Sequence, residues 1–148
     1  MKCITASSDH TEKLGRTIGT HLSGGTVLRI IGGLGMGKTV LARGIARGLG
    51  ICEPVTSPSY TIIEEYPGSP GLVHIDLYRI HDPEEIDEIG IIEYIGSSEH
   101  VLLIEWADKA PVDMFGPAYE VRIEPGHTPE ERHIHITPDI DLVEPEHD

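Results

Sequence analysis

The sequence predicts an α/β fold built on buried parallel strands, and three observations point to it. Two short apolar runs, residues 27–31 and 101–104, have the composition of strands that are covered on both faces. Residues 9–22 and 38–49 repeat apolar positions every three or four residues, which is typical of amphipathic helices. A glycine-rich stretch joins the first apolar run to the second helix, so strand, loop and helix follow directly on one another.

The N-terminal half carries signals for the ends of both helices. Asp9 and Glu12 have the spacing of a capping box at the start of the first helix, and Gly24 follows its last turn. Gly50 is placed to end the second helix in left-handed backbone. We therefore expect two helices with a strand between them.

The middle of the chain predicts a loop followed by two strands. Residues 53–70 are rich in Pro, Ser and Thr, and we expect a loop that leads into a hairpin edge at 60–63. Residues 73–76 predict a brief strand. The run 101–104 predicts a central strand whose carboxyl end carries Glu105.

A further helix and a hairpin complete the prediction. Residues 82–85, Asp-Pro-Glu-Glu, place an acid, a proline and two more acids where a helix start favours them. The expected inner face of this helix carries Ile86, Ile89 and Ile92. Residues 119–123 and 133–137 alternate in polarity around a turn containing Pro and Gly, which predicts a C-terminal β-hairpin.

Residues 32–39, GGLGMGKT, satisfy the phosphate-binding pattern GxxxxGK[ST]. The glycines let successive backbone N–H groups turn toward a β-phosphate, where a Cβ would obstruct the turn or the ligand. Lys38 supplies a mobile positive charge for the β- and γ-phosphates, and the Thr39 hydroxyl is a Mg²⁺ ligand at the start of the helix. We therefore expect ATP to bind here with Mg²⁺.

Hydrolysis also requires a carboxylate at the end of a neighbouring strand, to hold Mg²⁺ or to orient water. Glu105 has that position, and Asp76 is a second candidate, although aspartates at strand ends are also common turn formers. We interpret Trp106 as a packing residue in preference to a nucleotide stack. The hydroxyl groups of residues 56–61 could reach the γ-phosphate or Mg²⁺, or could simply face solvent.

Length and charge narrow the class of protein. The 148 residues suit one domain, which we place at 1–138, followed by an acidic tail at 139–148. The chain has 25 Asp and Glu against 11 Lys and Arg, so its surface as a whole repels nucleic acid. Cys3 and Cys52 lack the spacing of a metal or redox site, and no run approaches a membrane helix in length. We expect a soluble cytoplasmic protein with no export signal.

In its motifs the sequence resembles the TsaE family, the P-loop ATPases that bacteria require for threonylcarbamoyladenosine (t6A) modification of tRNA. The resemblance covers most of residues 9–123. It rests on GGLGMGKT, TSPSYT at 56–61, HIDLYR at 74–79, DPEE with EIGIIEY, and LIEWAD at 103–108, in this order. It implies a P-loop NTPase fold in which a mostly parallel sheet is flanked by helices.

The resemblance also implies roles for individual residues. Nucleotide contacts fall on Leu34, Gly35, Met36, Gly37, Lys38 and Thr39, with Ser7 and Ser8 toward the adenine. Catalytic roles fall on Lys38, Asp76 and Glu105, the Mg²⁺ ligands on Thr39 and Glu105, and a switch-like loop on residues 56–61. The implied activity is ATP hydrolysis together with the TsaD and TsaB proteins, which would contact the tRNA, without any membrane.

Three positions depart from the family pattern: Gly33 replaces an acid, Val40 a second threonine, and Ala107 a proline. None of them alters the predicted catalytic residues.

Three other functions were weighed. A GTPase is excluded because the chain contains neither the Asn nor the Gln that guanine recognition and water positioning use. A small P-loop kinase would need a lid with several arginines, but Arg43 and Arg47 lie on the helix after the loop. A nucleotide-gated binding module with negligible hydrolysis remains open.

Overall fold

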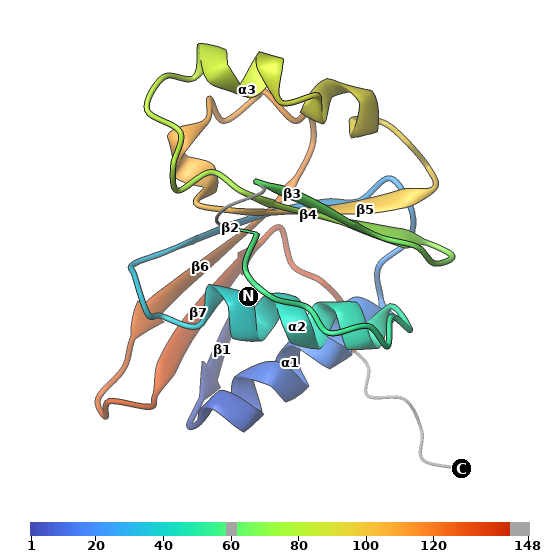
Figure 1. Cartoon of the computed structure of the whole chain (residues 1–148). Helices are drawn as coiled ribbons and strands as arrows, with labels where there is room; N and C mark the ends of the chain where they lie inside the picture. The colour runs from blue at the N-terminus through green and yellow to red at the C-terminus, as the bar shows by residue number, and fades with distance from the viewer. Residues whose placement is uncertain (59–61, 143–148) are drawn as a thin grey trace.

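The computed structural model describes residues 1–58 and 62–142, which form a seven-stranded mixed sheet between two layers of helices (Figure 1). The strand order is β1-β7-β6-β2-β5-β4-β3. The strands are β1 Lys2–Thr5, β2 Val27–Gly32, β3 Ile63–Tyr66, β4 Gly71–Asp76, β5 His100–Glu105, β6 Tyr119–Pro125 and β7 Arg132–Thr137. The centre is parallel, because β2 pairs with β5 and β6, and β5 pairs with β4. The α/β prediction with a mostly parallel core and a C-terminal hairpin, β6 with β7, is confirmed.

The helices cover the sheet on both faces (Figure 1). Helices α1 Ser8–Thr20 and α2 Lys38–Gly48 lie on one face, and α3 Glu84–Glu88 lies on the other with the short 3-10 turns η1 Ile91–Tyr94 and η2 Ala107–Lys109. Strand β2 has apolar residues on both of its faces. Leu28 and Ile30 belong to the core under α1 and α2, while Val27 belongs to the core on the opposite face.

Two predicted boundaries shift in the structure. Helix α1 begins with Ser7 as its N-cap, because Ser7 is extended and its hydroxyl accepts a hydrogen bond from the His10 amide at 3.1 Å; the capping box predicted at Asp9 is wrong. The hairpin edge lies at β3, residues 63–66, where it pairs antiparallel with β4. Of the predicted strand at 60–63, residues 60 and 61 lie outside the described residues, and only its last residue belongs to β3.

The helix predicted after residue 82 is shorter than expected. Gly90 has a φ of +84°, so the chain leaves α3 after five residues and re-enters as η1. The change of direction buries Ile91 and leaves Ile92 58% exposed. The prediction that Ile92 lies on the inner face is therefore wrong, whereas that for Ile86 is confirmed.

The two ends of the described chain meet at the β1 edge of the sheet, a strand that the sequence analysis did not predict. The Met1 amino group donates to the Ile136 carbonyl and to the Asp139 carboxylate. Ile140 is buried in the core beneath α1 and α2. Residues 143–148 lie outside the described residues, so the boundary of the acidic tail at 139 stays a prediction. Of the helices in the described ranges, none has the length and apolar character needed to cross a membrane.

Helices α1 and α2 pack with their backbones in direct contact at glycines. A Cβ added to Gly15 would lie 2.5 Å from the Leu41 carbonyl oxygen, and one added to Gly44 would lie 2.1 Å from the Glu12 carbonyl oxygen. Gly19 and Gly48 repeat the pattern one turn later. Because the opposing atoms are backbone, no side-chain rotation can relieve such a clash. The glycines thus fix the distance between α1 and the helix that follows the phosphate loop.

We predict that Gly15→Ala destabilises the protein, even though alanine is the better helix former by about 1 kcal/mol. Overpacking against backbone should outweigh this gain and lower the free energy of unfolding by about 1 to 3 kcal/mol. Lys13→Ala, at an exposed position of the same helix, is the control and should change little. Urea denaturation measures both, and a Gly15→Ala protein as stable as the parent would contradict the prediction.

Candidate phosphate-binding site

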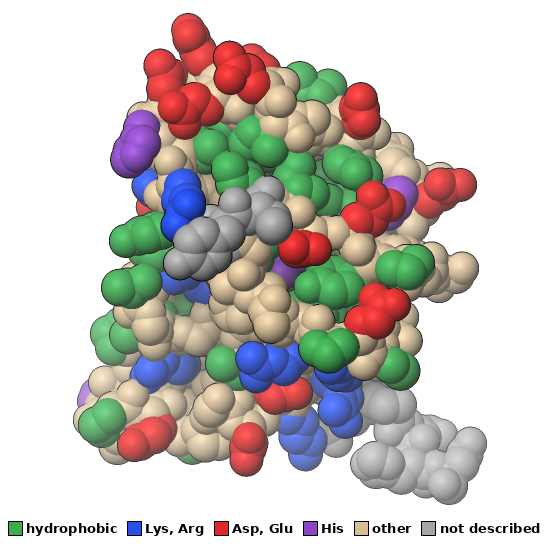
Figure 2. Space-filling view, in the orientation of Figure 1, with side chains coloured by type: hydrophobic (Ala, Val, Ile, Leu, Met, Phe, Trp, Pro, Cys, Tyr) green, Lys and Arg blue, Asp and Glu red, His purple; other side chains and the backbone are tan. Residues whose placement is uncertain are grey.

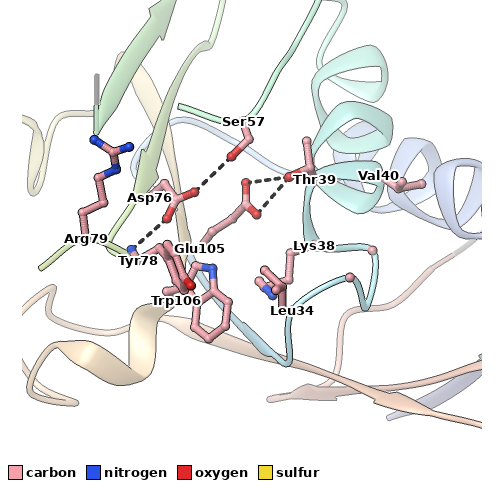
Figure 3. Close-up of a pocket in the computed structure, with 12 residues that line it drawn as sticks. Leu34, Lys38, Thr39, Val40, Ser57, Asp76, Tyr78, Arg79, Glu105 and Trp106 are labelled. Carbon is pink, nitrogen blue, oxygen red and sulfur yellow. Dashed lines mark hydrogen bonds between the residues drawn. The ribbon is translucent and has the colours of Figure 1, made fainter. Parts of the chain in front are cut away.

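The predicted catalytic residues meet in one pocket of about 510 Å³ at the carboxyl ends of β2, β4 and β5 (Figure 3). The pocket is lined by Leu34, Gly35, Gly37, Lys38, Thr39, Val40, Ser57, Asp76, Tyr78, Arg79, Glu105 and Trp106. Such an edge is where open α/β sheets bind ligands. The structure therefore brings Asp76 and Glu105, from two other strands, to the adjacent residues Lys38 and Thr39.

The loop between β2 and α2 adopts a backbone that favours glycine. Gly35 has a φ of +75° and Gly37 a φ of +98°, and a Cβ at either position would be strained by that conformation. Gly37 is the N-cap of α2, and no side chain of the described residues caps the helix there. The first amide groups of α2 are thus available to a negatively charged ligand, and the helix dipole favours one.

Lys38 turns back over the loop that precedes it. Its Nζ donates to the carbonyl oxygens of Gly32 at 2.8 Å and Gly33 at 2.7 Å, and lies 4.1 Å from the centroid of the Trp106 ring. Burial lowers the pKa of Lys38, and the negative charges of Glu105, Asp76 and Asp108 partly oppose that shift. The amine is held at the mouth of the loop by groups that a phosphate could replace.

Thr39 and Glu105 connect the start of α2 with the end of β5. The Thr39 hydroxyl donates to Glu105 Oε1 at 3.2 Å (Figure 3). Only 2% of Glu105 is exposed. A hydroxyl and a carboxylate are the oxygen ligands that Mg²⁺ accepts, with phosphate and water completing its octahedron. Two protein oxygens leave most of the octahedron to other ligands, so this donor set fits an ion that is also bound by phosphate.

Asp76 lies beside Glu105, because the two residues are partners in the register of β4 and β5. It is 2% exposed, and its Oδ1 accepts from the Tyr78 amide at 2.8 Å while Oδ2 accepts from the Ser57 hydroxyl at 3.0 Å (Figure 3). Ser57 comes from the predicted switch-like loop at 56–61, of which residues 59–61 lie outside the described residues. The Asp76 carboxylate is thus hydrogen-bonded both to the turn that follows β4 and to the loop that carries Ser57.

Trp106 follows Glu105 in left-handed backbone, with a φ of +55°. Its ring packs against Tyr78, with centroids 4.9 Å apart, as well as against Lys38. The buried Arg29 of β2 donates to the next carbonyl, that of Ala107, at 3.1 Å. These ring contacts are packing contacts, the role expected for Trp106. The hydrogen bond from Arg29 stabilises the strained turn.

A smaller cavity of about 180 Å³ adjoins the loop on the side of α1. It is lined by Ser8, Thr11, Gly35, Met36, Gly37, Val40, Pro129, Glu130 and Arg132. Of the two serines expected near adenine, Ser8 lines this cavity and the Ser7 hydroxyl caps α1. Arg132 Nε donates to the Met36 carbonyl at 3.0 Å, which attaches β7 to the loop.

Several lining residues were missed by sequence reasoning. Tyr78 and Arg79 lie in the turn directly after Asp76, so proximity to a predicted acid was an available signal. Pro129, Glu130 and Arg132 come from the β6–β7 hairpin, and no local pattern indicates that this hairpin reaches the loop.

Comparison with known proteins gives consistent matches over most of the chain. Residues 5–134 match the model of the family described as "Threonylcarbamoyl adenosine biosynthesis protein TsaE". The chain is 36% identical over 123 residues to the tRNA threonylcarbamoyladenosine biosynthesis protein TsaE of Treponema pallidum, covering 83% of this chain and 89% of that protein. Its identity to the Bacillus subtilis protein of the same name is 39% over 108 residues, covering 72% of this chain and 66% of that one.

A solved structure agrees with these matches. The crystal structure of Bacillus subtilis YdiB is similar to this chain with a TM-score of 0.71 and 31% identity. The similarity covers 90% of this chain and 82% of YdiB.

The left-handed backbone at Trp106 generates a prediction about stability. Once the ring is removed, alanine still has a Cβ that this conformation disfavours, whereas glycine does not. Trp106→Gly should therefore be more stable than Trp106→Ala by about 1 kcal/mol, the reverse of the usual order. Chemical denaturation of the two variants measures the difference, and a Trp106→Ala protein that is equal or superior would show that the turn is unstrained.

Proposed function

The chain belongs to the TsaE family, and from this premise we propose that it binds and hydrolyses Mg·ATP in threonylcarbamoyl modification of tRNA adenosine. The observation that carries the proposal is the convergence of three groups on one pocket. The Lys38 amine, the Thr39 hydroxyl and the Glu105 carboxylate meet at the N-terminus of α2. These are the groups that a triphosphate and its metal ion require.

Each group has a distinct part in binding. The amides at the start of α2 and the loop donate to the phosphate oxygens. Lys38 exchanges its hydrogen bonds to the Gly32 and Gly33 carbonyls for bonds to the β- and γ-phosphates. Thr39 and Glu105 would together hold Mg²⁺, and the ion would supply positive charge against the negative charge that develops on the transferred phosphoryl group.

Asp76 is placed to act on the water that attacks the γ-phosphate. It is buried beside Glu105, and its carboxylate is oriented by the Tyr78 amide and by Ser57. A carboxylate held from two sides can accept a proton or a hydrogen bond in a fixed direction. The hydrogen bond from Ser57 supports a link between this loop and hydrolysis.

The TsaD and TsaB proteins are the proposed partners, and tRNA is reached only through them in the cytoplasm. The formal net charge of −14 disfavours direct contact with a phosphate backbone. Figure 2 shows acidic side chains gathered over α3, on the side of the sheet away from α1 and α2. A basic surface on a partner protein would complement this region better than RNA would.

The arrangement of arginines supports ATP hydrolysis over transfer to a small molecule. Arg47 on α2 donates to the carbonyls of Ile51 and Glu53, and Arg132 donates to Met36, Pro129 and Glu131. These arginines stabilise loops, and Arg79 is the one arginine among the described residues that lines the pocket with Lys38. A lid of the kind that kinases use needs several arginines around the transferred phosphoryl group. A nucleotide-gated module without hydrolysis uses the same pocket, and measurement of turnover separates the two.

Lys38→Ala should bind Mg·ATP about ten- to hundredfold more weakly than the parent, because a charge-assisted hydrogen bond contributes about 1.5 to 3 kcal/mol. Isothermal titration calorimetry measures the affinity. Lys13→Ala, which removes an exposed lysine outside the cavities at the phosphate loop, is the charge-matched control and should bind as the parent does. Equal affinity of Lys38→Ala and parent would refute the proposed site.

The isolated protein should release phosphate slowly, and addition of TsaD and TsaB should raise the rate by at least about tenfold, since a partner can supply missing transition-state charge. Asp76→Ala should retain ATP binding and lose this stimulated release, whereas Glu105→Ala should lose both the stimulated release and the contribution of Mg²⁺ to ATP binding. Steady-state phosphate assays test both statements. Rapid release by the isolated protein would contradict the first, and no release under any condition would favour the binding module.

A further inference from the structure

His74 is a buried residue of β4 that contacts the candidate metal ligand directly. Its Nε2 is hydrogen-bonded to Glu105 Oε2, and the His74 side chain is 0% exposed. In the register of β4 and β5, His74 pairs with Leu103 and Asp76 pairs with Glu105. His74 therefore lies two residues before the carboxyl end of β4. It lies on the same face of β4 as Asp76, and it contacts Glu105 from the buried side because it does not line the pocket.

We propose that His74 is a positioning residue that fixes the Glu105 carboxylate for Mg²⁺, an inference that rests on the proposed function. Two groups hold this carboxylate. Thr39 donates to Oε1 at 3.2 Å from the pocket side, and His74 holds Oε2 from the core side. When the Thr39 oxygen turns to a metal ion, His74 is the one side chain in the described ranges that still holds Glu105 by a hydrogen bond.

The contacts of the imidazole identify which nitrogen carries the proton. A carboxylate only accepts hydrogen bonds, so Nε2–H is the donor to Glu105. Nδ1 is buried without a partner among the described residues. A proton there would be an unpaired buried donor, which is costly, whereas a bare lone pair is tolerated better. The geometry thus directs a ring N–H at the Glu105 carboxylate.

Loss of the hydrogen bond from His74 should weaken metal binding more than nucleotide binding. His74 lines none of the three cavities that border the phosphate loop among the described residues, so its removal leaves the loop amides, Lys38 and the Thr39 hydroxyl in place. A carboxylate that loses its supporting hydrogen bond must be ordered when the ion binds. Loss of such outer partners weakens metal affinity by about ten- to hundredfold in well-studied sites.

The test compares three variants by calorimetry with ATP in EDTA and ATP in excess Mg²⁺. The quantity measured is the dissociation constant of ATP in EDTA divided by that in excess Mg²⁺. This ratio reports how strongly the ion and the nucleotide favour each other's binding. His74→Leu removes the donor and should reduce the ratio about tenfold, with the constant in EDTA unchanged. His74→Gln keeps an N–H donor near Nε2 and should preserve most of the ratio.

Leu72→Ala is the structural control, because Leu72 is buried on the same face of β4 two residues earlier. It should lower the melting temperature and leave the ratio unchanged. If His74→Leu fails to fold, His74→Met takes its place, since methionine fills the space without a donor and adapts to irregular cores.

The outcomes separate this inference from the proposed function. A parent protein that binds ATP no better with Mg²⁺ than in EDTA refutes the proposed function. A parent that shows the Mg²⁺ effect, with a His74→Leu variant that shows it equally, overturns the positioning role alone. If His74→Gln and His74→Leu lose the Mg²⁺ effect equally, the positioning role is also overturned, because the hydrogen bond would then not account for the loss.

Discussion

The hydrogen bond between Thr39 and Glu105 is the interaction on which the site depends, because it joins the start of a helix to the end of a strand. The parallel pairing of β2 with β5 brings the two residues together, and the pairing of β4 with β5 adds Asp76 beside them. A hydroxyl, two buried carboxylates and an amine thus share one edge of the sheet. The fold supplies the geometry before any ligand contributes to it.

The site tolerates several features that would be unfavourable elsewhere. Glu105 and Asp76 are neighbouring buried carboxylates, Trp106 has left-handed backbone, and Lys38 is desolvated. Each is stabilised by a specific partner, and among these partners Arg29 is notable as a buried cation in the strand before the loop. Strain and buried charge concentrate where the ligand is expected, as they do at functional sites in general.

The parts of the fold that could be predicted from the sequence are those with local signals. The loop from Gly32 to Thr39, the strand that ends at Glu105 and the C-terminal hairpin each have a pattern within a few residues. The contact of His74 with Glu105 depends on the register between two strands, which no local pattern encodes. Strand β1 is short and lies at the edge, where pairing with β7 decides its structure. Long-range pairing, not weak propensity, accounts for most of what was missed.

The glycine contact between α1 and α2 has a mechanical consequence. Where two helices touch through side chains, rotamer changes can absorb a small displacement, but carbonyl oxygens and Cα atoms at van der Waals distance cannot. Helix α1, whose first turn borders the smaller cavity, and α2, whose first turn carries Lys38, are therefore held at a fixed spacing by backbone contacts. Neither helix can approach the other more closely, so the width of the smaller cavity between their first turns is set by backbone atoms.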